Sequence, residues 1–232
     1  MLKIVAKSIS FLFHPLLVLT YILVLLILID PYAFGTSGIG DMLSKVLILR
    51  VFLSTFFIPA LAMAMLYFLG MVRSFNLDDK QDRTGPYIIT GIFYLWLFRN
   101  FLDSSLVPSI FACFMLAATI ALFLAFLINI FSKISIHAVG LGSLISMVIL
   151  TMAFVRYNTL ILPVPFVGNF ELSIILMLLI IIIIAGLVGT CRMYLTKHEI
   201  NDLFGGYLVG MLSPFVALQV MIFLGKLQMP IG

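Results

Sequence analysis

Residues 191–210 read CRMYLTKHEINDLFGGYLVG, a short polar segment between two strongly apolar ones. Within eleven residues it gathers five ionisable side chains, namely Arg192, Lys197, His198, Glu199 and Asp202. Only 9% of the chain is charged, so a cluster of this density requires a reason. Each flanking apolar run has about the 20 residues that a membrane-spanning helix needs. The segment therefore predicts a polar turn that joins two membrane helices.

The composition is that of an integral membrane protein. Hydrophobic residues make up 64% of the chain and charged residues 9%, against roughly 25% charged in soluble domains. We expect one all-α transmembrane domain over residues 1–232, a polytopic bundle of about seven helices in a bacterial inner (cytoplasmic) membrane. The net charge of +4 does not indicate nucleic acid. Two cysteines indicate neither a disulfide framework nor a metal site.

Apolar runs separated by polar breaks predict helices at about residues 8–30, 45–72, 87–102, 106–131, 138–155, 170–191 and 203–225. The third run is short and contains Arg99, and residues 156–169 are expected to form a connecting loop. A proline inside a helix kinks it, so His14-Pro15 predicts a kink in the first helix. His14 could reach the polar segments, but a histidine bonded to a neighbouring helix is the simpler interpretation.

Three polar segments fall on one face of the predicted bundle. Residues 73–86, 132–137 and 191–202 are separated from one another by two predicted crossings each. An even number of crossings returns the chain to the same face, so the three segments can build one composite site. If residues 87–131 crossed the membrane only once, the first segment would lie on the opposite face.

The spacing within 191–210 suits chemistry on a phosphate group. His198 and Asp202 are four residues apart and share one face of a helix. A carboxylate bound to one imidazole nitrogen leaves the other as a nucleophile or base. Arg192, whose planar fork suits phosphate, is rotated by roughly 240° from His198 on a straight helix, so a bend near Thr196 is required. The structural alternative is that Arg192 and Lys197 extend to the membrane surface and that Asn201 or Asp202 caps the last helix.

His137 is a second histidine on the same face, in the segment SKISIH at 132–137. A protonated imidazole there could donate to a leaving oxygen, and Ser135 could donate to phosphate. The structural alternative is a capping and interfacial patch at the start of a helix. Two histidines on one face, each next to a cation, favour the chemical interpretation.

The run Arg192-x5-His198-x3-Asp202-x3-Gly206-x3-Gly210 closely resembles the third signature of the type 2 phosphatidic acid phosphatase (PAP2) superfamily. That signature reads roughly S-R-x5-H-x3-D with glycines following, and Cys191 takes the place of its serine.

The other two signatures are present in altered form. Ser135-Ile136-His137 is similar to the second signature, P-S-G-H, with isoleucine replacing proline and glycine. The first signature, K-x6-R-P, is altered most, because Lys80 and Arg83 are three residues apart and a glycine precedes Pro86. The resemblance covers about residues 73–225, which would form a PAP2-like core.

The resemblance implies a metal-independent phosphatase that needs no cofactor. His198 would attack phosphorus to form a phosphohistidine, Asp202 would orient it, and His137 would protonate the leaving alcohol. Four further side chains would bind the substrate phosphate, namely Arg192, Ser135, Lys80 and Arg83. Membrane members of the superfamily act on a lipid phosphate or a polyprenyl pyrophosphate, so these substrates and membrane lipids are the expected partners.

Two other classes of protein remain open. Asp78 and Asp82 loosely resemble the aspartates through which UbiA-type prenyltransferases bind prenyl pyrophosphate and Mg²⁺. A non-catalytic PAP2-like protein that binds or transports lipids would also place charges within the membrane. Mg²⁺-dependent activity that survives His198→Ala would favour the first class, and lipid binding without turnover the second.

Overall fold

A computed structural model of the chain describes residues 1–73, 81–155, 157–164 and 168–228. The α-helices within these ranges are α1 (Leu2–Leu12), α2 (Val18–Ile29), α3 (Met42–Phe52), α4 (Ile58–Phe68), α5 (Thr84–Leu102), α6 (Ser109–Phe131), α7 (Ile136–Phe154), α8 (Ile174–Tyr194) and α9 (Ile200–Phe223). Short 3₁₀ turns, η1 (Pro15–Leu17), η2 (Pro31–Phe34) and η4 (Gln81–Arg83), and a π-helical turn, η3 (Leu53–Phe57), join or interrupt them. Two strands, β1 (Thr159–Val164) and β2 (Gly168–Ser173), form a hairpin.

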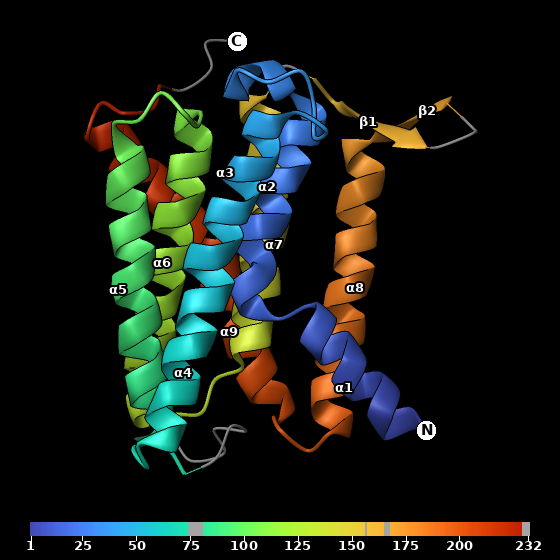
Figure 1. Cartoon of the computed structure of the whole chain (residues 1–232). Coiled ribbons are helices and arrows are strands. Elements are labelled where there is room, and N and C mark those ends of the chain that lie inside the picture. Colours follow the sequence, from blue (N-terminus) through green and yellow to red (C-terminus); the bar gives the residue numbers. More distant parts are fainter. Residues whose placement is uncertain (74–80, 156, 165–167, 229–232) are drawn as a thin grey trace.

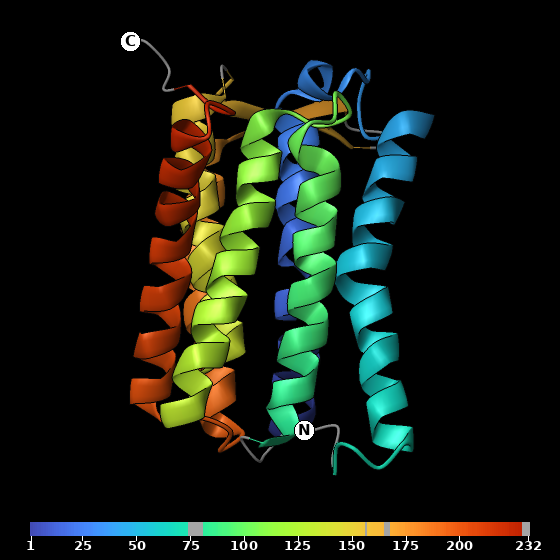
Figure 2. The ribbon, with the colours of Figure 1, turned by 90° about the vertical axis from the view of Figure 1, so that its left-hand side faces the viewer.

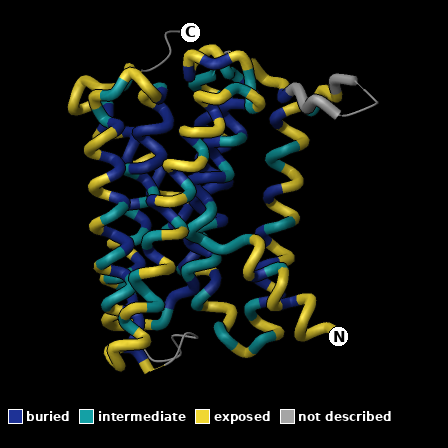
Figure 3. Tube along the Cα trace, in the orientation of Figure 1, coloured by how far each residue is buried: buried dark blue, intermediate teal, exposed yellow. Residues whose placement is uncertain are grey.

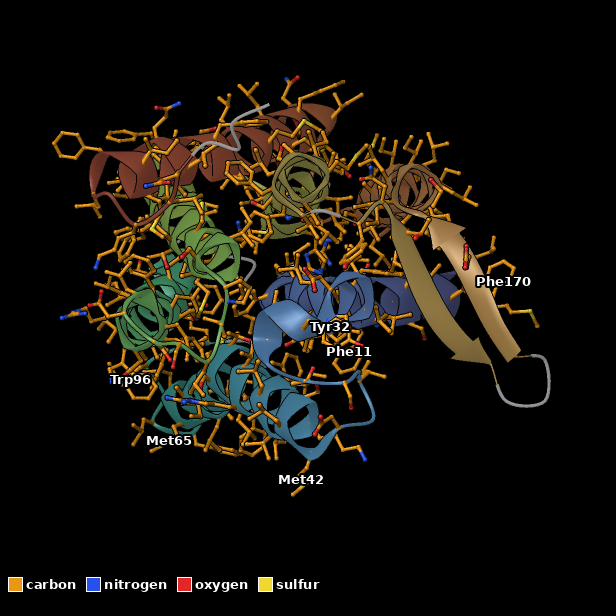
Figure 4. All side chains as sticks on the ribbon, turned by 90° about the horizontal axis from the view of Figure 1, so that it is seen from above. Phe11, Tyr32, Met42, Met65, Trp96 and Phe170 are labelled. Atoms are coloured by element: carbon orange, nitrogen blue, oxygen red, sulfur yellow. The ribbon has the colours of Figure 1, made fainter. Side chains whose placement is uncertain are left out.

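Within the described ranges, six helices are long and apolar enough to cross a membrane, counting the broken pairs α1–α2 and α3–α4 as one each. This agrees with the all-α membrane bundle that the composition predicts. A further helix, α5, runs beside them from one end of the bundle to the other (Figures 1 and 2). The outer surface is apolar, and Met42, Met65 and Trp96 lie on the outside of the bundle (Figure 4).

The centre of the bundle is α7, whose residues are mostly buried (Figure 3). It packs closely against α9 because glycines stand at the crossing. A Cβ atom on Gly206 would lie 2.7 Å from the carbonyl oxygen of Ser135, and one on Gly142 would lie 2.7 Å from that of Tyr207. On Gly210 it would overlap the carbonyl oxygen of Val139. Small residues let membrane helices approach in this way.

The first helix breaks where the sequence predicts a kink. α1 ends at Leu12, His14 is the N-cap of η1, and Pro15 is the first residue of that turn. Proline suits the first turn of a helix but not its interior. α1, which precedes the break, is inclined away from α2 and lies beside the lower part of α8 (Figure 1).

The prediction of a loop over residues 156–169 is wrong in part. β1 pairs with β2 in antiparallel register, with Thr159 opposite Ser173, so α8 begins at Ile174 instead of residue 170. The hydroxyl of Ser173 accepts the backbone N–H of Ile175 at 3.3 Å and caps α8. Pro163 fits because a two-stranded sheet has only edge strands. The hairpin projects sideways past the end of α8 (Figures 1 and 4).

Three loops meet at one end of the bundle, which we call the polar end. They comprise residues 71–73 with 81–83, residues 132–135, and residues 195–199, all at the bottom of Figure 1. The hairpin, the η2 segment and the turn between α5 and α6 lie at the opposite end. The fold therefore brings together described parts of all three polar segments of the sequence.

Candidate functional site

The turn between α8 and α9 supplies the bend that the sequence requires near Thr196. Thr196 adopts a left-handed backbone conformation, with φ of 54°. Its N–H donates to the carbonyl oxygen of Met193 at 2.8 Å. The N–H of Lys197 donates to the carbonyl oxygen of Arg192 at 3.1 Å, which completes a Schellman motif. Glycine is usual at the left-handed position, so a β-branched threonine there stores backbone strain.

The carboxylate of Asp202 holds His198. Oδ2 of Asp202 lies 3.3 Å from Nδ1 of His198 and also accepts the backbone N–H of Glu199 at 3.2 Å. The second bond belongs to the capping box that begins α9. Because a carboxylate only accepts, we assign the imidazole proton to Nδ1, which leaves the lone pair on Nε2. Asp202 thus both caps the helix and orients the histidine.

The charges of Arg192 and Arg83 act on His198, whose side chain is only 5% exposed. Burial and the charge of Arg192 lower the pKa of His198 to about 4, although Asp202 acts in the opposite direction. The ring is therefore neutral near pH 7, the form that has a free lone pair. Arg192 also acts electrostatically on His14 and His137. One guanidinium thus lies near three imidazoles.

Ser135 is fully buried at the start of α7. It occupies the N-cap position, yet its side chain makes no capping hydrogen bond. Its hydroxyl has no hydrogen-bond partner within the described part of the chain. A buried polar group left in this state costs about 1–3 kcal/mol. The Ser135 side chain therefore does not cap α7, in contrast to the structural alternative for this segment.

His137 lies in the first turn of α7 and contacts the N-terminal segment. Its Nε2 atom lies 3.0 Å from the carbonyl oxygen of Ser10 in α1. Its ring meets the ring of His14 edge-on, with the centroids 5.5 Å apart. The predicted bond between His14 and a neighbouring helix is thus replaced by ring contact. Among the described residues, no group of three or more His, Cys, Asp and Glu side chains could hold a metal ion.

Arg83 comes from the first polar segment and is buried as the N-cap of α5. Its Nη1 atom donates to Oδ1 of Asn129 in α6 at 3.4 Å. Its charge also lowers the pKa of His198. This effect is smaller than those of burial and of Arg192, and smaller than the opposing effect of the hydrogen bond to Asp202. Lys80, the other predicted phosphate ligand of this segment, lies outside the described residues.

Of the acids in the first segment, Asp78 lies outside the described residues and Asp82 is buried. Oδ2 of Asp82 accepts the backbone N–H of Arg73 at 3.3 Å. This carboxylate therefore ties together the two described parts of its own loop.

A shallow groove of about 160 Å³ runs between α8 and α9. Its walls include Gly186, Gly189 and Met193 of α8 and Ile200, Leu203 and Tyr207 of α9. Met193 and Ile200 flank the turn that carries His198, so the groove begins beside the charged cluster. Gly186 leaves it open, because a Cβ atom there would meet nothing within 4 Å.

The structure adds three residues that sequence reasoning did not assign to the site, namely Ser10, His14 and Asn129. Ser10 contributes a backbone carbonyl, which no side-chain pattern reveals. Asn129 and His14 are polar side chains within long apolar runs, and such residues in membrane helices are often functional. That signal could have marked both.

Comparison with protein-family models, with curated proteins and with solved structures finds no significant match to this chain.

Proposed function

We propose that this protein is a membrane-embedded phosphohydrolase of the PAP2 type, which hydrolyses a lipid phosphate monoester or pyrophosphate through a phosphohistidine on His198. The observation that carries the proposal is the bond between Asp202 and Nδ1 of His198 beside Arg192. It leaves Nε2 of a neutral imidazole as the available nucleophile within a field of positive charge.

The reaction follows in two steps. Nε2 of His198 forms a bond to phosphorus while the bond to the leaving oxygen breaks, and His137 gives a proton to that oxygen. Water then attacks the phosphohistidine and gives its proton to His137, while the bond between phosphorus and Nε2 of His198 breaks. This step releases inorganic phosphate and restores both histidines. Arg192 and Arg83 balance the charge of the phosphoryl oxygens, and the buried hydroxyl of Ser135 adds a donor.

The surroundings of the site favour a lipid over a soluble phosphate ester. The groove between α8 and α9 opens on the apolar outer surface of the bundle and reaches the turn that carries His198. A hydrocarbon chain could lie in it while the phosphate group reaches Arg192. We therefore assign the substrate to amphiphiles with a phosphate or pyrophosphate headgroup.

Phosphate release tests the proposal. The purified protein in detergent with EDTA should release phosphate from phosphatidic acid or a polyprenyl pyrophosphate. His198→Ala and Arg192→Ala should each lower the rate by at least about 100-fold. Lys45→Ala is the matched control, because it removes an exposed cation at the opposite end of the bundle. Activity that needs Mg²⁺ and survives His198→Ala, or lipid binding without turnover, would contradict the proposal.

A further inference from the structure

The break between α1 and α2 lies against α7 at the candidate site. Nδ1 of His14 accepts the backbone N–H of Leu16 at 3.3 Å and so caps the turn that follows the break. Pro15 lies against α7, where a Cβ atom on Gly140 would come within 3.0 Å of it. The break therefore sits directly beside the first turn of α7, which carries His137.

Two carbonyl groups at the end of α1 are bound by side chains from other helices. The last four carbonyl groups of a helix lack partners within that helix. In α1 those of Ile9 and Phe11 accept the backbone N–H groups of Phe13 and His14, that of Leu12 accepts the hydroxyl of Tyr21, and that of Ser10 is bound by His137. The hydrogen bond thus satisfies both the carbonyl group of Ser10 at the end of α1 and the Nε2 atom of His137.

These bonds fix the tautomers of both histidines. A carbonyl oxygen only accepts, so Nε2 of His137 carries the proton and its lone pair is on Nδ1. Nδ1 of His14 accepts from the backbone, so its proton is on Nε2. The His14 ring is held edge-on between His137, at 5.5 Å, and Phe56, at 6.2 Å. Neither ring of the pair is free to turn over without breaking a bond.

We propose that His14 is a positioning residue of the site: together with the Ser10 carbonyl it holds the His137 ring so that Nδ1 is its reactive nitrogen. This inference rests on the proposed function. When His137 is protonated, the leaving oxygen takes the proton from Nδ1, and the electron pair of the broken N–H bond stays on Nδ1. The Nε2–H group keeps its bond to Ser10 throughout. The N-terminal segment, outside residues 73–225, thereby becomes part of the catalytic unit.

Two substitutions separate the ring of His14 from its cap. His14→Asn keeps an oxygen where Nδ1 caps the turn but removes the ring. His14→Phe keeps a ring between Phe56 and His137 but removes the cap. If the ring positions His137, His14→Asn should lower kcat by about 10- to 100-fold at unchanged KM, and His14→Phe should retain more activity. The reverse order, or wild-type kcat in His14→Asn, would overturn the inference.

Nitrogen-15 spectra of the histidines give a readout that does not need turnover. The chain has only three histidines, so single substitutions assign the signals. In the wild-type protein, His137 should show protonated Nε2 and unprotonated Nδ1, and His14→Asn should produce a mixture. Protonation of Nδ1 alone in the wild type would overturn the inference. If His137 shows the expected tautomer but the protein releases no phosphate from any lipid substrate, the proposed function would be overturned instead. The proton transfer from Nδ1 would then be overturned as well.

Discussion

The backbone N–H of Ser135 donates to the backbone carbonyl oxygen of Asp202 at 3.2 Å. This bond joins the residue that precedes α7 to the first turn of α9. His137 follows the donor by two residues, and His198 precedes the acceptor by four. The main chain thereby fixes to each other the two segments that carry these histidines, although they are more than 60 residues apart in sequence.

The two roles of Asp202 can be separated by substitution. Asp202→Asn can still accept the backbone N–H of Glu199, so α9 should remain capped and the melting temperature close to that of the wild type. Without the carboxylate charge, the rate of phosphate release should fall by at least about 100-fold. Asp202→Ala should lose the activity and also about 1 kcal/mol of unfolding free energy. Equal activity of Asp202→Asn and the wild type would show that this carboxylate only caps.

The pKa of His198 predicts an unusual titration. In the folded protein its imidazole should take up a proton only near pH 4, where a free histidine would do so near pH 6.5. Lowering the pH from 7 to 5 should therefore leave His198 neutral. Chemical-shift titration of His198 in the substrate-free protein measures this directly.

The same titration has an internal control. Removing the positive charge in Arg192→Gln should raise the pKa of His198, because that charge opposes protonation. Asp202→Asn should lower it further, because the carboxylate favours the protonated ring. Shifts of the opposite sign would mean that these groups do not face the imidazole.

The groove predicts which substitutions discriminate between substrates. Gly186→Leu should fill it and raise KM for a long-chain lipid phosphate about tenfold, since displacing two methylene groups costs about 1.6 kcal/mol. KM for a short, soluble phosphate ester should not change. Gly205→Leu is the control, because a Cβ atom there also meets nothing within 4 Å and the groove does not include it. Equal effects on both substrates would remove the groove from the binding site.

Chemical labelling tests the arrangement of the ends. The two native cysteines are buried and can be replaced by alanine. Cysteines at the exposed positions Met71, Ser132 and Thr196 should then react with a membrane-impermeant reagent from one side of the membrane, and a cysteine at Ser105 from the other. Reaction of Met71→Cys and Ser105→Cys from the same side would mean that α5 does not cross.

The strained turn predicts a stabilising substitution. Thr196→Gly should relieve the cost of the left-handed backbone and raise the unfolding free energy by about 1 kcal/mol. Thermal unfolding in detergent measures the change. Thr196→Ala, which keeps a Cβ atom in the same conformation, should not stabilise the protein to the same extent. If it does, the side chain and not the backbone is the source of the strain.

Much of the fold could be predicted from local signals. Apart from the first helix, which begins at Leu2 instead of about residue 8, the apolar runs locate the helices to within a few residues. The break at His14-Pro15 follows from the chemistry of proline. The bend at Thr196 follows from helix geometry, because Arg192 and His198 face different sides of a straight helix. Counting crossings places the polar segments at one end, and the described parts of all three lie there.

The features that the sequence does not predict depend on contacts between residues that are distant in the chain. The β-hairpin was missed because residues 159–173 contain two prolines and no alternation strong enough to outweigh them. The bond from Ser10 to His137 spans 127 residues and uses a carbonyl group, which every residue has. The bond from Arg83 to Asn129 likewise follows from the packing of α5 on α6. Such pairs become visible only when the helices are placed in space.

The close crossing of α7 and α9 at the glycines sets the distance between His137 and His198. At Gly210 the backbone of α9 faces backbone atoms of Val139 and Ser143, and at Gly206 it faces the carbonyl oxygen of Ser135 and the small side chain of Ala138. Little side-chain volume therefore separates the two helices at this crossing. Substitutions can change the charges around His137 and His198, but the distance between the two histidines depends mainly on backbone atoms at this crossing. Even a methyl group at Gly210 would push α9 away from α7, and the distance between the imidazole rings of His137 and His198 would change as a result.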